Sequence, residues 1–218
     1  MTKSLLNLHQ KSFLDFFCSR PELYKKFYFS GGTALSEYYL KHRYSEDLDF
    51  FSETEIKSTD LSLFLTTYKK EFGAEQVQYT QSFNRNIFFI HYEKDQTLKV
   101  EFTYYPFTRL EKGLQKDNLQ IDSALDIAVN KSFTLMQQAR GRDYFDIYML
   151  CQTYAFDFFV LIKKARQKFD YPINYLELGK NLTKVCSFLD DPILIIDIDR
   201  NKIEDYFLDI AKKLEMLK

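Results

Sequence analysis

The sequence predicts an α+β protein, with helices and strands mixed up to about residue 120 and almost only helices after it. Two observations support this prediction. First, three segments rich in aromatic and β-branched residues follow one another closely and are typical of strands: 77–80, 87–92 and 98–105. Second, after Pro106 the apolar residues recur at the intervals of three and four that are typical of helices.

The change of pattern near residue 120 is also the candidate domain boundary. We expect a core domain over residues 1–120 and a helical domain over residues 121–218. A cleft between two lobes is a common place for a ligand, so we expect the binding site there.

The single elements follow from the apolar spacing and from the few glycine and proline residues. Strands are expected over 26–30 and 47–51, in addition to the three named above. The turn at 93–96 predicts a hairpin between the last two strands of the block. Helices are expected over the remaining patterned segments: 4–19, 33–42, 58–72, 122–152, 157–170, 174–188 and 200–217.

Composition excludes several classes of protein. Lys and Arg number 30 and Asp and Glu number 31, so the net charge of −1 gives no overall attraction to nucleic acid or membrane. No apolar run approaches the roughly 20 residues that span a bilayer, and the N-terminus lacks the apolar core of a signal peptide. Three distant cysteines argue against a disulfide framework or a zinc finger, so we expect a reduced, cytoplasmic compartment.

A glycine pair at the end of a predicted strand is the first candidate binding feature. Gly31 and Gly32 stand between this strand and a helix, where free backbone N–H groups and the helix dipole favour a phosphate. Thr33 adds a hydroxyl that can donate a hydrogen bond. The alternative is a tight turn without a ligand, and from the glycines alone this alternative is the more common one.

An acidic pair follows about 15 residues later. Residues two apart on a strand point to the same face, so Asp47 and Asp49 present their carboxylates side by side. Two such acids repel each other unless a cation neutralises them, and oxygen ligands of this kind suit Mg²⁺. The alternative is a solvent-facing strand end with Arg43 as ion-pair partner.

A third acid stands on a neighbouring predicted strand. Strict alternation places Lys99, Glu101 and Thr103 on one face of the segment 98–105. Three carboxylates from two strands could hold two divalent ions about 4 Å apart, as in phosphoryl and nucleotidyl transfer. The alternative for Glu101 is a cross-strand pair with Lys99 or another lysine.

The helical part contains a second charged cluster. Lys131 lies at the edge of the apolar face of its helix, and either reaches a phosphate in the expected cleft or is simply solvated. Asp143 and Asp146 fall on the inward side of the next helix, and buried carboxylates need a cation or a ligand. Arg142 could pair with Asp146 at i,i+4 spacing. The two acids are therefore either structural anchors or active-site acids.

Taken together, these motifs resemble a known family. The run from Gly31 to Leu35, followed by Arg43, Ser45, Asp47 and Asp49, resembles the first motif of the AbiEii/AbiGii toxin-type nucleotidyltransferases, a branch of the DNA polymerase β-like superfamily. The segment 99–102 is similar to their strand with a third acid. Lys131, Arg140 and the run 142–150 resemble their helical Lys…Arg…Arg-Asp-x-x-Asp motifs.

The resemblance implies a fold and a reaction. The fold is a mixed sheet with flanking helices, followed by a helical bundle. The reaction is transfer of a nucleoside monophosphate from an NTP with Mg²⁺, or Mn²⁺ in its place, to an acceptor such as tRNA or another RNA. Relatives act in bacterial toxin–antitoxin or phage-defence systems, which implies a cognate antitoxin as a partner.

The same resemblance assigns roles to the site residues. The metal ligands are Asp47, Asp49 and Glu101, and Glu101 can also act as the base toward the acceptor hydroxyl. The nucleotide is bound by Gly31, Gly32, Thr33, Arg43, Ser45 and Lys131. The catalytic set is Asp47, Asp49, Glu101, Lys131, Asp143 and Asp146. Two alternatives stay open: transfer to a small molecule or a protein, and a non-catalytic module that binds an NTP or a partner.

Overall fold

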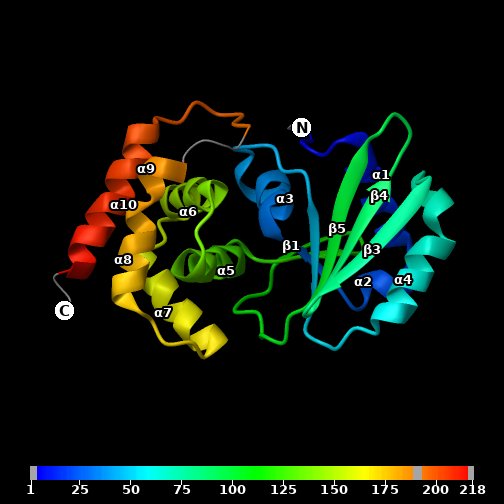
Figure 1. Cartoon of the computed structure of the whole chain (residues 1–218), viewed down its shortest axis with the longest axis horizontal. Coiled ribbons are helices and arrows are strands. Elements are labelled where there is room, and N and C mark those ends of the chain that lie inside the picture. Colours follow the sequence, from blue (N-terminus) through cyan, green and yellow to red (C-terminus); the bar gives the residue numbers. More distant parts are fainter. Residues whose placement is uncertain (1–3, 189–192, 216–218) are drawn as a thin grey trace. The chain divides into compact units, whose positions relative to one another are not determined.

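The computed structural model describes residues 4–188 and 193–215 (Figure 1). The chain divides into two compact units. The first contains residues 1–39 and 45–123, and the second contains residues 40–44 and 124–218. The main crossing from one unit to the other therefore falls between Ser123 and Ala124, and a short segment of the N-terminal half belongs to the second unit.

A seven-stranded mixed sheet forms the centre of the first unit, with the strand order β3-β4-β5-β2-β1-β7-β6. The strands are β1 Tyr28–Ser30, β2 Leu48–Ser52, β3 Gln76–Ser82, β4 Arg85–His91, β5 Thr97–Tyr104, β6 Leu114–Lys116 and β7 Leu119–Ile121. The helical elements of this unit are α1 Leu8–Ser19, α2 Pro21–Tyr24, α3 Gly31–Leu35, the π-helix Ser36–Leu40 at the unit boundary, α4 Ser58–Thr67 and the 3₁₀ turn Lys69–Phe72. The predicted mixed sheet with flanking helices is confirmed.

The register of β2 and β5 places the acidic residues together. The two strands are neighbours, as the sequence predicts; they run parallel, and Asp49 stands directly opposite Glu101. Residues opposite each other in a ladder share a face, so both side chains lie on the same face of the sheet. The other face of these strands carries apolar residues, of which Phe50 and Phe102 are fully buried.

Helix α1 covers this apolar face. Its residues Phe13 and Phe17 pack on Phe50 with ring centroids 6.1 Å and 4.3 Å apart, and the Phe50 ring stacks in turn on Phe102 at 5.0 Å. Aromatic pairs at such distances stabilise a core beyond the area that they bury. The apolar packing thus fixes β2 from one side and leaves its acidic residues on the other.

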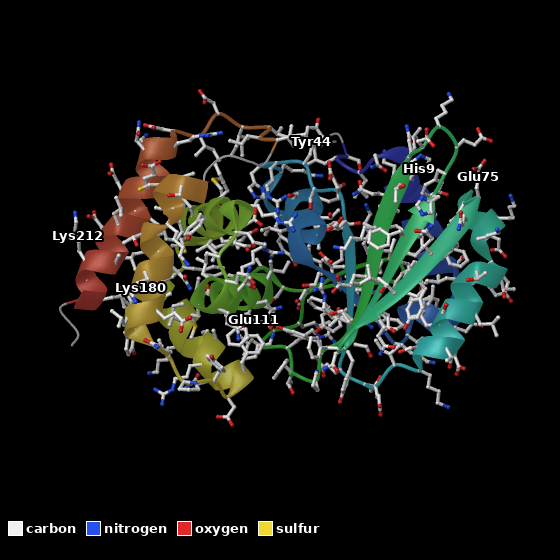
Figure 2. The ribbon with its side chains drawn as sticks, viewed as in Figure 1. His9, Tyr44, Glu75, Glu111, Lys180 and Lys212 are labelled. Atoms are coloured by element: carbon white, nitrogen blue, oxygen red, sulfur yellow. The ribbon has the colours of Figure 1, made fainter. Side chains whose placement is uncertain are left out.

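The hairpin between β4 and β5 forms as predicted. Lys94 and Asp95 both have positive φ, 60° and 57°, which is the conformation of a tight two-residue turn. His9 of α1 stacks on Tyr92 at the end of β4, with ring centroids 3.7 Å apart, and Figure 2 labels it there. α1 is thereby fixed to the hairpin.

Six helices form the second unit within the described residues. They are α5 Ala124–Gln137, α6 Gly141–Tyr154, α7 Phe158–Phe169, α8 Tyr175–Thr183, α9 Val185–Phe188 and α10 Arg200–Glu215. The helix expected over 200–217 is thus found up to residue 215, and residues 216–217 lie outside the described part. No single described helix has both the length and the apolar character needed to cross a membrane; α6 and α7 meet these criteria only as a pair bent by 113°.

The segment Leu40–Tyr44 belongs to this helical unit through backbone pairing. The N–H of Tyr44 donates to the carbonyl of Ile193, and the N–H of Ile195 donates to the carbonyl of His42, both at 2.9 Å. Figure 2 labels Tyr44, whose side chain is exposed. Residues far apart in sequence are thus joined as a short antiparallel bridge.

Two short strands and one helix start differ from the sequence prediction. β7 pairs in parallel with β1, and β6 pairs antiparallel with β7. Neither β6 nor β7 was predicted, because a strand of three residues is too short to show alternation of apolar and polar residues. Pro21, which follows the predicted first helix, stands at the first position of the one-turn helix α2, which the sequence pattern does not predict. Proline suits this position because the first N–H of a helix has no partner within the helix.

Candidate active site

The turn between β1 and α3 is shaped around the carboxylate of Asp49. Gly31 has φ +75°, a conformation that side chains with a Cβ rarely adopt. A Cβ at Gly31 would lie 2.2 Å from Asp49 Oδ2, so only glycine leaves room for this acid. Asp49 pairs with Ser30 on one side and with Glu101 on the other. The glycine turn and the acidic strand therefore meet, as a nucleotide site requires.

Asp47 stands just before β2 and is held by Lys99 and Thr33. The ammonium of Lys99 lies 2.9 Å from Asp47 Oδ2. The Thr33 hydroxyl, which is buried, donates to the backbone carbonyl of Asp47. The sequence assigned this hydroxyl to a phosphate, but it fastens the glycine turn to the acidic strand instead. Gly31, Gly32 and Thr33 thus offer backbone N–H groups rather than this side chain.

Glu101 is paired with an arginine that sequence reasoning missed. Arg85 on β4 donates two hydrogen bonds to the Glu101 carboxylate, from Nε to Oε1 and from Nη2 to Oε2, each at 2.6 Å. The hydroxyl of Thr103 also donates to Oε1, at 2.9 Å. Burial raises the pKa of Glu101, but the hydrogen bonds from Arg85 and Thr103 outweigh it, and the pKa lies below its ordinary value. Glu101 is therefore ionised at neutral pH, and it is too weakly basic for a good general base.

The donor set decides how well a divalent cation fits. Asp47 precedes β2 directly and Asp49 is its second residue, so the two carboxylates stand two positions apart, and the space at Gly31 admits that of Asp49. Such oxygens suit Mg²⁺. Both oxygens of Glu101 already accept a hydrogen bond from Arg85, which weakens them as ligands for a cation. As the described residues stand, no three His, Cys, Asp or Glu side chains are grouped to hold a metal ion, so a three-carboxylate site stays a prediction.

Two further residues of the first unit position the turn and the strand. Gln10 of α1 is buried and donates its amide to the carbonyls of Ser45 and Glu46, at 2.8 Å and 3.0 Å. Asp122, which follows β7 and is also buried, accepts a hydrogen bond from the Ser30 hydroxyl at 2.8 Å. Neither shows in the sequence as a motif, because each acts on a segment at least 35 positions away.

The second charged cluster forms within the helical unit. Lys131 of α5 lies 2.8 Å from Asp143 Oδ1 and 2.6 Å from Asp146 Oδ2, both on α6, and Arg140 Nε lies 2.8 Å from Asp143 Oδ2. Both acids are fully buried. Lys131 is therefore a partner of these acids and not a solvated helix lysine. Burial raises the pKa of Asp143, but the charges of Lys131 and Arg140 outweigh it and hold the pKa below its ordinary value.

Arg43 and His42 complete this cluster, and Arg43 is the partner of Asp146 that the sequence predicted to be Arg142. Arg43 binds both oxygens of Asp146, at 2.7 Å and 2.8 Å, and His42 Nε2 lies 2.7 Å from the same carboxylate. Arg43 thus holds Asp146 with its buried guanidinium, and binding of a nucleotide by Arg43 stays a prediction. Asp146 needs no pairing with Arg142, whose side chain is exposed.

The charge balance around Asp146 explains why it can be buried. Burial raises its pKa, but Lys131 and Arg43 outweigh this effect and hold the pKa well below its ordinary value.

Ser45, expected at the nucleotide, is half-buried, and its backbone carbonyl is the group held by Gln10. The structure thus gathers the predicted residues in two clusters: the glycine turn with the carboxylates, and Lys131 with Arg43 and the α6 acids.

Comparison with known proteins identifies the family. A family model described as the nucleotidyl transferase AbiEii toxin of a type IV toxin–antitoxin system matches residues 13–207. The chain belongs to the AbiEii nucleotidyltransferase family. It is therefore an enzyme of the nucleotidyltransferase class, and the motif positions predicted from the sequence lie within the matched range.

Solved structures show the same fold. The Helicobacter pylori protein JHP933 superimposes with a TM-score of 0.64 at 19% identity, covering 95% of this chain and 90% of that one. A second H. pylori protein, described as a candidate nucleotidyltransferase, gives 0.62 at 20% identity, covering 96% of each chain. A curated but uncharacterized protein of Aquifex aeolicus is 28% identical over 145 residues, which is 66% of this chain and 66% of that protein.

Proposed function

We propose that this AbiEii family member transfers a nucleoside monophosphate from an NTP to an acceptor hydroxyl, with Mg²⁺ or Mn²⁺ bound by Asp47 and Asp49. The observation that supports this most directly is the fit of the Asp49 carboxylate against Gly31, which places an acid of the sheet beside the glycine turn. A divalent cation at these acids would neutralise the phosphate charge that grows during transfer.

The chain's own residues have separate tasks in this proposal. The backbone N–H groups at Gly31 and Gly32 bind phosphate oxygens at the start of α3. Glu101 contributes negative charge beside Asp49 rather than accepting a proton, because the hydrogen bonds from Arg85 and Thr103 lower its pKa and make it a weaker base. Lys131, with Asp143 and Asp146 as its anchors, is proposed to bind a phosphate of the nucleotide.

The acceptor and the biological setting are part of the proposal. RNA, and tRNA in particular, is the leading acceptor, and the net charge of −1 is compatible with recognition of a short RNA end rather than a long duplex. The family description supports a role in a toxin–antitoxin system, and hence a cognate antitoxin. Transfer to a small molecule or a protein keeps the same site and changes only the acceptor.

A non-catalytic binding module was the alternative left open by the sequence, and membership of the AbiEii nucleotidyltransferase family argues against it. From the sequence alone, neighbouring carboxylates without a cation would repel each other, and this repulsion argues against a module that has no use for a metal. In the structure, Asp47 and Glu101 have the cationic partners Lys99 and Arg85, so the acids can persist without a metal. Catalysis must therefore be measured directly.

The test is incubation of the purified chain with each labelled NTP and Mg²⁺, in the presence of total tRNA, protein or small-molecule extract. We expect label in one fraction, loss of label with EDTA, and at least a hundredfold loss in Asp49→Asn. Asp60→Asn, an exposed acid on α4, is the matched control and should label normally. If no NTP labels any fraction, or if Asp49→Asn is as active as the unaltered chain, the proposed reaction is wrong.

A further inference from the structure

Lys99 stands among the carboxylates of the candidate active site. Its Nζ is 2.9 Å from Asp47 Oδ2 and 3.9 Å from Glu101 Oε2. One ammonium group therefore bridges the acid that directly precedes β2 and an acid on the neighbouring strand β5. A cation between carboxylates of neighbouring strands is also the arrangement expected of a bound divalent ion.

The two basic residues of this site hold their acids in different ways. Arg85 makes two parallel hydrogen bonds to Glu101, a geometry that is fixed and strong. Lys99 makes a single short contact to Asp47, and its side chain is 27% exposed at the end of a flexible four-carbon stem. Lys99 therefore has one short contact to break when it moves into solvent, whereas Arg85, although its side chain is 49% exposed, has two parallel ones.

We propose that Lys99 is a resident counter-ion that takes the place of the divalent cation in the metal-free enzyme and leaves when the cation binds. The inference rests on the proposed function, because the cation concerned is the one used in transfer. An ammonium group and a divalent ion repel each other at these distances, so both cannot stay at Asp47. Lys99 thus stabilises the acids while the site is empty and lowers the apparent affinity for the metal.

The experiment measures Mn²⁺ binding without nucleotide, by electron paramagnetic resonance of free Mn²⁺, for the unaltered chain and for Lys99→Met. Methionine keeps the length of the side chain and removes the charge. We expect Mn²⁺ to bind at least about tenfold more tightly to Lys99→Met, because the competing charge is gone. The matched control is Lys94→Met, the same substitution at an exposed residue of the adjacent turn, which should leave the affinity unchanged.

Thermal unfolding supplies a second readout. In EDTA, Lys99→Met should melt at a lower temperature than the unaltered chain, because Asp47 loses its partner. Addition of Mn²⁺ should raise the melting temperature of Lys99→Met by more than it raises that of the unaltered chain. Should Lys99→Met not fold, judged by circular dichroism, Lys99→Gln provides the same comparison. A folded variant that binds Mn²⁺ no more tightly than the unaltered chain overturns the inference.

The outcomes separate this inference from the proposed function. Labelled transfer by the unaltered chain, together with unchanged Mn²⁺ affinity in Lys99→Met, contradicts the counter-ion role alone. Tighter Mn²⁺ binding in Lys99→Met, without transfer of any NTP by the unaltered chain, supports the counter-ion role and contradicts the proposed reaction.

Discussion

Gly31 combines two requirements that no other residue type meets: φ of +75° and an Asp49 carboxylate where a Cβ would lie. We expect Gly31→Ala to lower the free energy of unfolding by about 2–4 kcal/mol, from backbone strain and overpacking together. Transfer of label should fall at least a hundredfold, because Asp49 must move. Urea denaturation and the transfer assay measure the two effects.

Gly73 provides the matched control for this prediction. It has φ +77° but no atom within 4 Å of the position of a Cβ, so Gly73→Ala adds strain without a clash. We expect a loss of about 1 kcal/mol and normal transfer. Equal losses of stability and activity in the two variants would show that the contact with Asp49 does not matter.

At the scale of elements, helix α1 positions the segment that leads into β2. The Gln10 side chain accepts a hydrogen bond from the N–H of Asn7 at 2.9 Å, and its amide donates to the carbonyls of Ser45 and Glu46. Gln10→Glu keeps the acceptor for Asn7 but turns a carboxylate toward two carbonyl oxygens. We expect a loss of about 2–3 kcal/mol in unfolding free energy and weaker transfer, because Asp47 follows this segment directly.

The control removes only the helix cap. Asn7 accepts a hydrogen bond from the N–H of Gln10 at 2.8 Å, and Asn7→Ala should cost about 1 kcal/mol. Because the contacts to Ser45 and Glu46 stay, transfer should be normal. Reduced transfer in Asn7→Ala to the level of Gln10→Glu would mean that general loosening of α1, and not the held segment, explains the effect.

At the scale of the whole molecule, Arg43 belongs to the N-terminal half by sequence and to the helical unit by structure. Arg43→Met leaves the buried Asp146 with Lys131 and His42. We expect a loss of about 3 kcal/mol at pH 7, near the lower end of the cost of breaking a buried pair. Hydrogen exchange should quicken in α5 and α6 and stay unchanged in the sheet.

The pH dependence of this loss follows from the pKa of Asp146, which lies well below its ordinary value in the folded chain. A depressed pKa contributes stability above the unfolded value of about 3.9, and this contribution disappears as the pH falls through the folded value. The stability difference between Arg43→Met and the unaltered chain should therefore shrink below about pH 4.

Arg85→Met is the control for the hydrogen-exchange prediction, because it makes the same substitution in the first unit. It should leave hydrogen exchange in α5 and α6 unaltered.

Several parts of this protein follow from the sequence alone, because they depend on neighbours a few residues away. Helical spacing and strand alternation report local burial, and they locate the long helices, the β4–β5 hairpin and the common face of Asp49 and Glu101. The glycine turn and the acidic pair are also local, and their order along the chain is enough to indicate the family.

Only the tertiary structure decides which charged groups meet. Arg43 stands four residues before Asp47 in the sequence, yet it binds Asp146, 103 positions away. The partner of Glu101 is Arg85, set by the register of β4 and β5. An ion pair depends on where side chains lie after folding, and the periodicity of a sequence carries no record of that distance. The sequence by itself therefore determined the chemistry of the acids and glycines, and the fold determined their partners.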